Sequence, residues 1–113
     1  MKNKKINNPM QIELNTLQEF EDWASLDNSN SKNKLALSKN IVNTILNNLD
    51  QKQIHIFEVL VKEVNTIYDI SVVEKDFIFT LEKNLKILEY FEEYELCETV
   101  NNTINKLKND QKN

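Results

Sequence analysis

Two side chains in this sequence are of the types that most often carry out chemistry, His55 and Cys97, and each is the only residue of its kind. His55 lies three residues before Glu58, a spacing at which both can ligate a metal on a helix when a second helix supplies carboxylates and another histidine. With one histidine in the chain, we expect no metal site. Cys97 would be a nucleophile only beside a base that lowers its thiol pKa. Because it falls on an apolar helical register among glutamates, we expect a small core residue.

The sequence contains no glycine and no arginine, and its one proline is Pro9. Glycine-rich phosphate loops and dinucleotide fingerprints need positive φ or close backbone approach, which glycine supplies without steric cost. A chain without arginine has no bidentate phosphate clamp and no arginine finger. Together with abundant Asn, Lys and Ile, these absences are also the bias of an AT-rich genome. Whatever the cause of these absences, the chemistry that glycine and arginine would supply is missing, so we expect no enzymatic activity and no cofactor.

The charge balance bears on the class of partner. The 113 residues include 14 basic ones, all lysine, and 18 acidic ones, for a formal net charge of −4. Since nucleic-acid binding depends largely on neutralising phosphates, we expect no direct nucleic-acid binding, with duplex affinity no tighter than roughly 10⁻⁴ M. A single cysteine excludes an intramolecular disulfide and fits a reducing cytoplasm. No apolar run resembles a secretory signal or a membrane span.

Acidic and aromatic side chains are concentrated in residues 89–98. A solvated helix face is one explanation, because the cost of like charges and the gain from acids near a helix start are each at most about 1 kcal/mol. Tyrosines among acids also suit the centre and rim of a protein interface. We therefore hypothesise a partner-binding surface made of Glu89, Tyr90, Glu92, Glu93, Tyr94, Glu95 and Glu98. Phe20 and Trp23 are a second candidate, since tryptophan is common in binding hot spots, with packing in the domain's own core as the alternative.

Apolar spacing predicts helices as the elements that position these residues. Thr16 and Glu19 have capping-box spacing and open a first helix, the segment 27–31 is a loop, and a second helix covers about residues 34–49. A third helix begins after Asp50. Its predicted buried stripe is Ile54, Phe57, Leu60, Val61, Val64, Ile67 and Tyr68. Residues 54–61 and 72–79 are rich in strand-forming types, but no glycine marks a turn between them, so helices are predicted there too.

A fourth helix is predicted to open at Ser71 and Glu74, a second capping-box pair. The polar step at Glu92 and Glu93 and the change of apolar phase at Leu96 then predict a hairpin into a fifth helix, with one bent helix as the alternative. We therefore predict an all-α fold, a small antiparallel bundle of four to five helices that ends in a helical hairpin. The domain is expected over residues 11–108, between flexible tails over 1–10 and 109–113.

Residues 81–107, LEKNLKILEYFEEYELCETVNNTINKL, resemble the UVR motif, a helical hairpin found in UvrB, UvrC and certain Clp-type chaperone partners. Leu81 to Lys83 open the segment, Tyr94 and Glu95 start its second helix, and Cys97 takes the small-residue position. The apolar register continues at Val100, Ile104 and Leu107. The family's paired alanines and Leu-Arg-Asp step are replaced here. The resemblance implies docking on a protein through the hairpin, without catalysis.

The sequence thus favours a small cytoplasmic protein-binding domain with no chemistry of its own. Our first hypothesis is an acidic accessory subunit or inhibitor that docks on a larger partner, such as a basic protein that handles nucleic acid. A virus-encoded inhibitor of host defence is one specific form of it. The alternative is a UVR-like adaptor in a DNA-repair or chaperone complex. Whether the chain also forms a homo-oligomer is left open.

Overall fold

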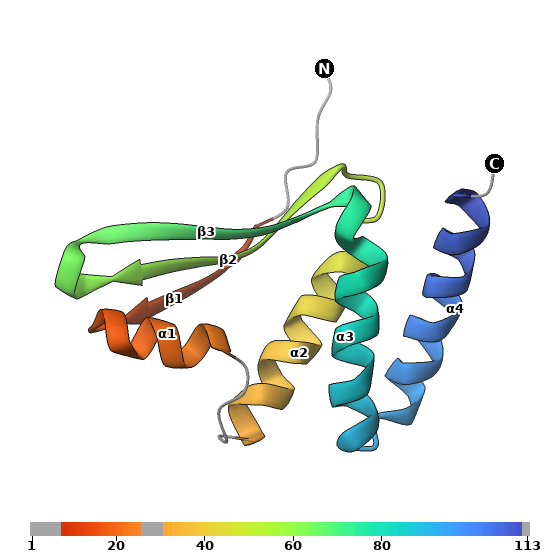
Figure 1. Ribbon diagram of the computed structural model, residues 1–113, viewed down its shortest axis with the longest axis horizontal. Coiled ribbons are helices and arrows are strands. Elements are labelled where there is room, and N and C mark those ends of the chain that lie inside the picture. The colour runs from red at the N-terminus through yellow and green to blue at the C-terminus, as the bar shows by residue number, and fades with distance from the viewer. Residues whose placement is uncertain (1–7, 26–30, 112–113) are drawn as a thin grey trace.

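The computed structural model describes residues 8–25 and 31–111 and combines a three-stranded sheet with four α-helices (Figure 1). The all-α helical bundle predicted from the sequence is therefore wrong, and the fold is mixed α/β. The elements in chain order are β1 (Met10–Leu14), α1 (Leu17–Ser25), α2 (Ser31–Leu46), β2 (Gln53–Val61), β3 (Thr66–Val73), α3 (Phe77–Tyr90) and α4 (Tyr94–Gln111). Short 3₁₀ turns at Lys62–Val64 and Glu74–Asp76 follow β2 and β3.

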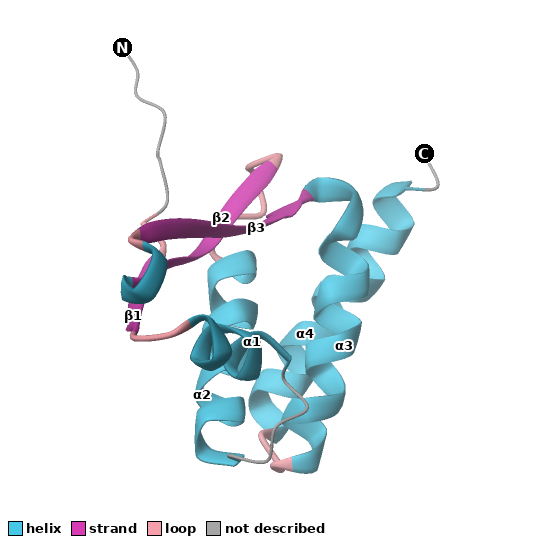
Figure 2. Ribbon diagram, turned by 60° about the vertical axis from the view of Figure 1, so that its left-hand side comes forward, coloured by secondary structure: helices cyan, strands magenta, loops and turns pink. Residues whose placement is uncertain are grey.

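The central strand of the sheet is β2, which pairs with β1 in parallel and with β3 in antiparallel orientation. Two parallel strands need a crossover connection, and α1 and α2 provide it. The register aligns Ile12, Val59 and Tyr68 in one row that faces the helices. All four helices lie on the same side of the sheet (Figures 1 and 2), so the other face is left uncovered by any described element.

The segment predicted as the third helix forms β2, a turn and β3 instead. A bulge between His55 and Phe57 interrupts the alternation of β2. The buried residues of β2 are Ile54, Ile56, Phe57, Val59 and Val61. Positions 54, 57 and 61 in this set are three and four residues apart, so the bulged strand imitates the apolar period of a helix.

An asparagine takes the place of glycine in the turn between β2 and β3. Asn65 has φ 49° and ψ 46°, in the left-handed region, and donates its N–H to the carbonyl of Lys62 at 3.1 Å. Asparagine enters this region more readily than most residues because its short polar side chain bonds locally. The absence of glycine therefore does not exclude a β-hairpin here.

The other predicted elements are confirmed in part. Thr16 caps α1, since its Oγ1 accepts the N–H of Glu19 at 3.1 Å. The second predicted helix is α2, although it begins and ends three residues earlier than expected. Ser71 lies in β3 and does not cap a helix, because α3 begins only at Phe77. The hairpin from α3 into α4 is present, in place of one bent helix.

The predicted boundaries shift at three places. β1 begins at Met10, within the predicted N-terminal tail, and α4 continues to Gln111 in the predicted C-terminal one. Of the predicted loop over 27–31, residues 27–30 lie outside the described residues and Ser31 begins α2.

The core lies between the inner face of the sheet and the helices α2, α3 and α4. It contains a buried polar contact between α2 and α3, in which the Ser38 hydroxyl donates to Asn84 Oδ1 at 2.9 Å and Asn84 Nδ2 donates to the carbonyl of Thr80. Because both side chains are paired, their burial is compatible with a stable core. The helical core residues are Val42, Ile45, Phe77, Leu81, Leu88, Cys97, Val100 and Ile104. None of the described helices is long and apolar enough to cross a membrane.

Candidate functional site

The acidic and aromatic residues predicted as a binding surface lie together around the turn between α3 and α4. We call residues 89–98 the hairpin tip. Figures 1 and 2 show this turn at the end of the helices that is remote from the sheet. It joins the last turn of α3 to the first turns of α4. The helical hairpin thus holds the tip away from the sheet.

Two tyrosines dominate the surface of the hairpin tip. Tyr90 ends α3 and is 80% exposed, and Tyr94 begins α4 and is 68% exposed. The ring of Tyr90 meets Phe91 edge-on at 5.0 Å between centroids, so one side of that ring is supported by the protein. Tyrosine offers a large apolar ring and a polar hydroxyl, which is why it is frequent where proteins bind one another.

The turn itself is held by backbone hydrogen bonds. The N–H of Glu93 donates to the carbonyl of Leu88 and the N–H of Glu92 donates to the carbonyl of Glu89, each at 3.0 Å. These two bonds form a Schellman motif, whose left-handed position usually holds glycine. Here Glu92 occupies it, with φ 60°. A side chain in this region is under steric strain of roughly 1–2 kcal/mol.

Replacing Glu92 with glycine is therefore expected to raise the free energy of unfolding by about 0.5–1 kcal/mol, because glycine takes positive φ without a Cβ clash. Glu98→Gly is the matched control, since Glu98 is an exposed glutamate beyond the first turn of α4 and glycine there should cost about 0.5–1 kcal/mol. Urea denaturation of both variants measures the difference. Equal destabilisation by the two changes would contradict the strained turn.

The charges of the hairpin tip are unevenly compensated. Lys39 of α2 lies 3.3 Å from Glu93 Oε1, which ties the tip to α2. The other four glutamates are exposed and form no ion pair with any residue in the described ranges: Glu89, Glu92, Glu95 and Glu98. Like charges this close repel one another, and a basic surface placed against them would relieve that repulsion.

Cys97 lies directly behind the hairpin tip, on the face of α4 that packs into the core. Burial raises the pKa of its thiol above the ordinary value, and the nearby carboxylates of Glu89 and Glu93 raise it further. The thiol therefore stays protonated near neutral pH. Since the thiolate is the nucleophile, Cys97 has the environment of an inert core residue, as expected from the sequence.

Alkylation of Cys97 by iodoacetamide at pH 8 should be at least tenfold slower in the folded protein than in urea, because both burial and the raised pKa disfavour the thiolate. The rate is followed by mass spectrometry of the intact chain. A native rate equal to the rate in urea would show that the thiol is accessible and ionised.

His55 belongs to a polar cluster on the uncovered face of the sheet. Its Nδ1 lies 2.9 Å from Ser71 Oγ and 3.2 Å from Asp69 Oδ2, and Ser71 donates to Asp69 Oδ1 at 2.9 Å. In a catalytic triad the acid and the serine occupy opposite nitrogens of the imidazole ring. Here both meet Nδ1, so the cluster joins β2 to β3 and is not arranged as a proton relay.

Metal binding finds no support in the described residues. Glu58, which the sequence places near His55, accepts a hydrogen bond from Gln11 Nε2 at 3.3 Å. Within residues 8–25 and 31–111, no group of three or more His, Cys, Asp and Glu side chains could hold a metal ion.

Phe20 and Trp23, the second candidate surface, attach α1 to the sheet. The ring of Phe20 stacks on Tyr68 at 4.7 Å, and Trp23 meets Phe57 edge-on at 4.9 Å. Both side chains are half-buried and pack against the core. Their use as a partner-binding surface stays a prediction, but a large part of each ring is already in contact within the molecule.

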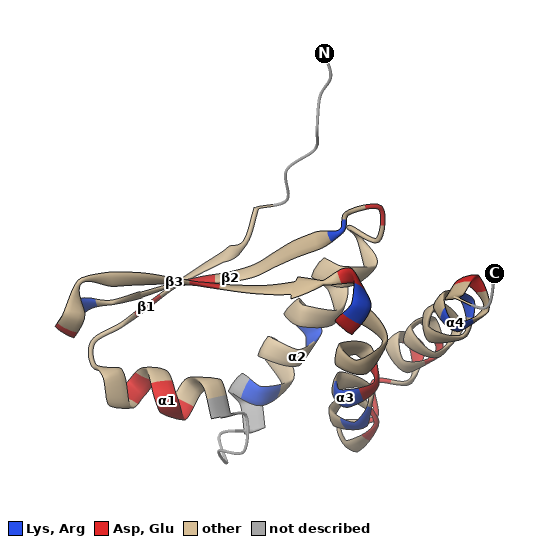
Figure 3. Ribbon diagram, turned by 45° about the horizontal axis from the view of Figure 1, so that its top comes forward, with Lys and Arg blue, Asp and Glu red and all other residues tan. Residues whose placement is uncertain are grey.

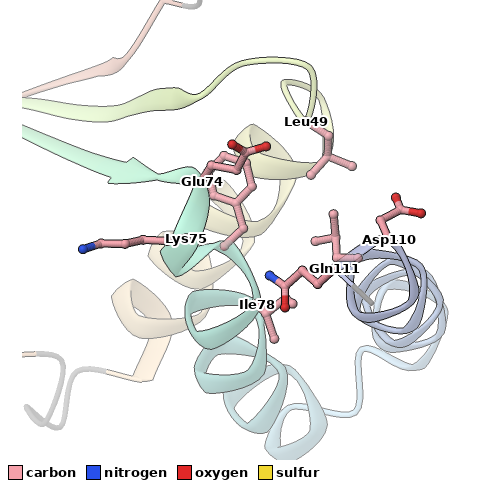
Figure 4. A pocket seen from close by; sticks show the side chains of 8 residues that line it. Leu49, Glu74, Lys75, Ile78, Asp110 and Gln111 are labelled. Atoms are coloured by element: carbon pink, nitrogen blue, oxygen red, sulfur yellow. The ribbon is translucent and has the colours of Figure 1, made fainter. Parts of the chain in front are cut away.

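A shallow hollow of about 450 Å³ lies at the opposite end of α3 and α4 from the hairpin tip. Three segments far apart in the sequence surround it (Figure 4), which explains why sequence patterns give no sign of it. Apolar and charged side chains line it together, and Lys75 points away from the other labelled residues in Figure 4. The full lining is Leu49, Glu74, Lys75, Phe77, Ile78, Leu107, Asp110 and Gln111. The lining residues include no histidine or cysteine.

No protein-family model matches this chain, and comparisons with curated proteins and with solved structures find no match. The geometry of the hairpin tip is therefore the main basis for a functional proposal.

Proposed function

We propose that this chain is a non-enzymatic protein-binding domain that docks on a larger partner through the hairpin tip. The observation that supports the proposal is the exposure of Tyr90 and Tyr94 beside four carboxylates that form no ion pair within the described part of the chain, on a turn fixed by backbone hydrogen bonds. Exposed aromatic rings surrounded by charged groups have the composition of an interface centre and its rim. A rigid turn loses little conformational entropy on binding.

The charge of the tip favours a partner with a basic surface, because opposite potentials steer two proteins together. A protein that handles nucleic acid has such a surface. In this proposal the chain acts in the cytoplasm as an accessory subunit or an inhibitor, and inhibition of host defence by a virus-encoded protein is one form of that role.

A UVR-like adaptor in a DNA-repair or chaperone complex is the second candidate. The observation that favours it is the antiparallel pair α3 and α4, which contains the whole UVR-like segment and buries Cys97 at its small-residue position. Both candidates use the helical hairpin and differ in the identity of the partner.

The test compares three baits in affinity capture from an extract of the source cells, with quantitative mass spectrometry. The baits are the native chain, a tip variant with Glu92, Glu95 and Glu98 changed to lysine, and a control variant with Glu21, Glu74 and Asp110 changed to lysine. All six residues are exposed and both variants change the net charge equally. A partner captured by the native and control baits and lost from the tip variant supports the proposal. Equal capture by all three baits contradicts it.

A further inference from the structure

The strand β3 lies at the edge of the sheet, and no described element pairs with its outer side. Its eight residues include no proline and no lysine, and its one charged residue, Asp69, interacts with Ser71 and His55. The strands carry few charged positions (Figure 3). Natural edge strands are usually protected by proline, lysine, a bulge or a short length, because their unpaired backbone groups can bind another strand. The opposite edge, β1, has five residues and follows Pro9.

The pairing with β2 determines which backbone groups of β3 are free. Glu74, just after β3, donates its N–H to the carbonyl of Lys52 at 2.8 Å, toward the β2 side. Successive residues of an antiparallel ladder direct their N–H and C=O groups to alternate sides. The odd-numbered residues therefore direct these groups to the open edge: Ile67, Asp69, Ser71 and Val73.

The side chains of β3 are complementary to a second copy of the same strand in one register. If a two-fold axis passes through Ile70, Ile67 lies opposite Val73 of the second copy. These side chains are 62% and 37% exposed, so pairing removes apolar surface from water. In the same register, Asp69 lies opposite Ser71 of the second copy. An axis through Asp69 would set two carboxylates against each other, which is destabilising.

We infer that the chain forms a two-fold dimer in which β3 pairs antiparallel with β3 of a second copy, centred on Ile70, so that two three-stranded sheets become one continuous sheet. This surface is separate from the hairpin tip, which lies at the far end of the helices (Figure 1). The inference therefore stands apart from the proposed function. A dimer would present two tips, and two linked contacts bind a multivalent partner more tightly than one.

Sedimentation equilibrium of the full chain tests the association. We expect a mass of twice 13.4 kDa for the native protein and 13.4 kDa for a variant with Ile67→Lys and Val73→Lys. The matched control changes Val64 and Phe79, two exposed apolar residues outside β3, to lysine and should remain dimeric. Circular dichroism confirms that each variant is folded. A monomeric native protein at millimolar concentration would overturn the inference, as would a lysine variant of β3 that remains dimeric.

Disulfide trapping tests the register. In a Cys97→Ala background, Ile67→Cys combined with Val73→Cys should give a covalent dimer on oxidation, because directly opposed residues are about 5.5 Å apart at Cα. The two positions in one copy are about 20 Å apart along the strand, too far for an internal bridge. Each single cysteine variant should remain uncross-linked. Equal cross-linking of a single variant and the double variant would overturn the register centred on Ile70.

Discussion

Replacing Phe77 with alanine should lower the free energy of unfolding by about 3–5 kcal/mol, the usual cost of removing a buried aromatic ring. Phe77 is 2% exposed and lies in the core at the start of α3. Such a loss is a large part of the 5–15 kcal/mol that stabilises a typical domain. Urea denaturation followed by the fluorescence of Trp23 measures it.

Phe79 provides a matched control on the same helix. It is 64% exposed, and its ring contacts the ammonium group of Lys83, which lies 5.8 Å from the ring centroid. A cation–π contact at an exposed site contributes about 0.5–1 kcal/mol, so Phe79→Ala should cost no more than about 1 kcal/mol. Similar losses at the two positions would show that the buried face of α3 is assigned wrongly.

The second large effect is expected on binding. Once a partner is identified, lysine at Glu92, Glu95 and Glu98 should lower its association rate constant at least tenfold at low salt, because three attractive charges become repulsive. Glu93 is left unchanged in this variant, since its carboxylate pairs with Lys39 and its reversal would also affect stability. Raising the salt concentration should slow association of the native protein more than it speeds dissociation.

The control for that measurement is the variant with lysine at Glu21, Glu74 and Asp110, which carries the same net charge but leaves the hairpin tip intact. Its association rate should fall by less than about threefold, because these carboxylates lie away from the tip. If both variants associate at the native rate, the tip is not the binding surface, and Phe20 with Trp23 becomes the next candidate.

The helices could be predicted where the signal is local. The cap at Thr16 and the apolar residues of α2, α3 and α4 lie within a few turns of one another, so their spacing alone identifies them. The sheet could not be predicted in this way. Its longest strand contains a bulge that imitates a helical period, its hairpin turns at Asn65 instead of glycine, and β1 pairs with a strand more than forty residues away.

In the candidate site, too, some features can be predicted from the sequence and others depend on the fold. Composition alone identifies the glutamates and tyrosines of the hairpin tip, because they are adjacent in the sequence. The ion pair of Glu93 with Lys39 depends on how α2 packs beside the hairpin. The cluster of His55, Asp69 and Ser71 depends on the pairing of β2 with β3. Such contacts are set by tertiary structure, which local periodicity does not encode.

The central claim is that the hairpin tip is the surface that binds a partner, and hydrogen–deuterium exchange of the complex tests it most directly. In the free protein, amide groups in residues 89–98 should exchange faster than those of the buried strand β2, since the tip is exposed. Binding should slow exchange in residues 89–98 and leave residues 17–25 unchanged. Slower exchange in residues 17–25, with no change in residues 89–98, would contradict the account.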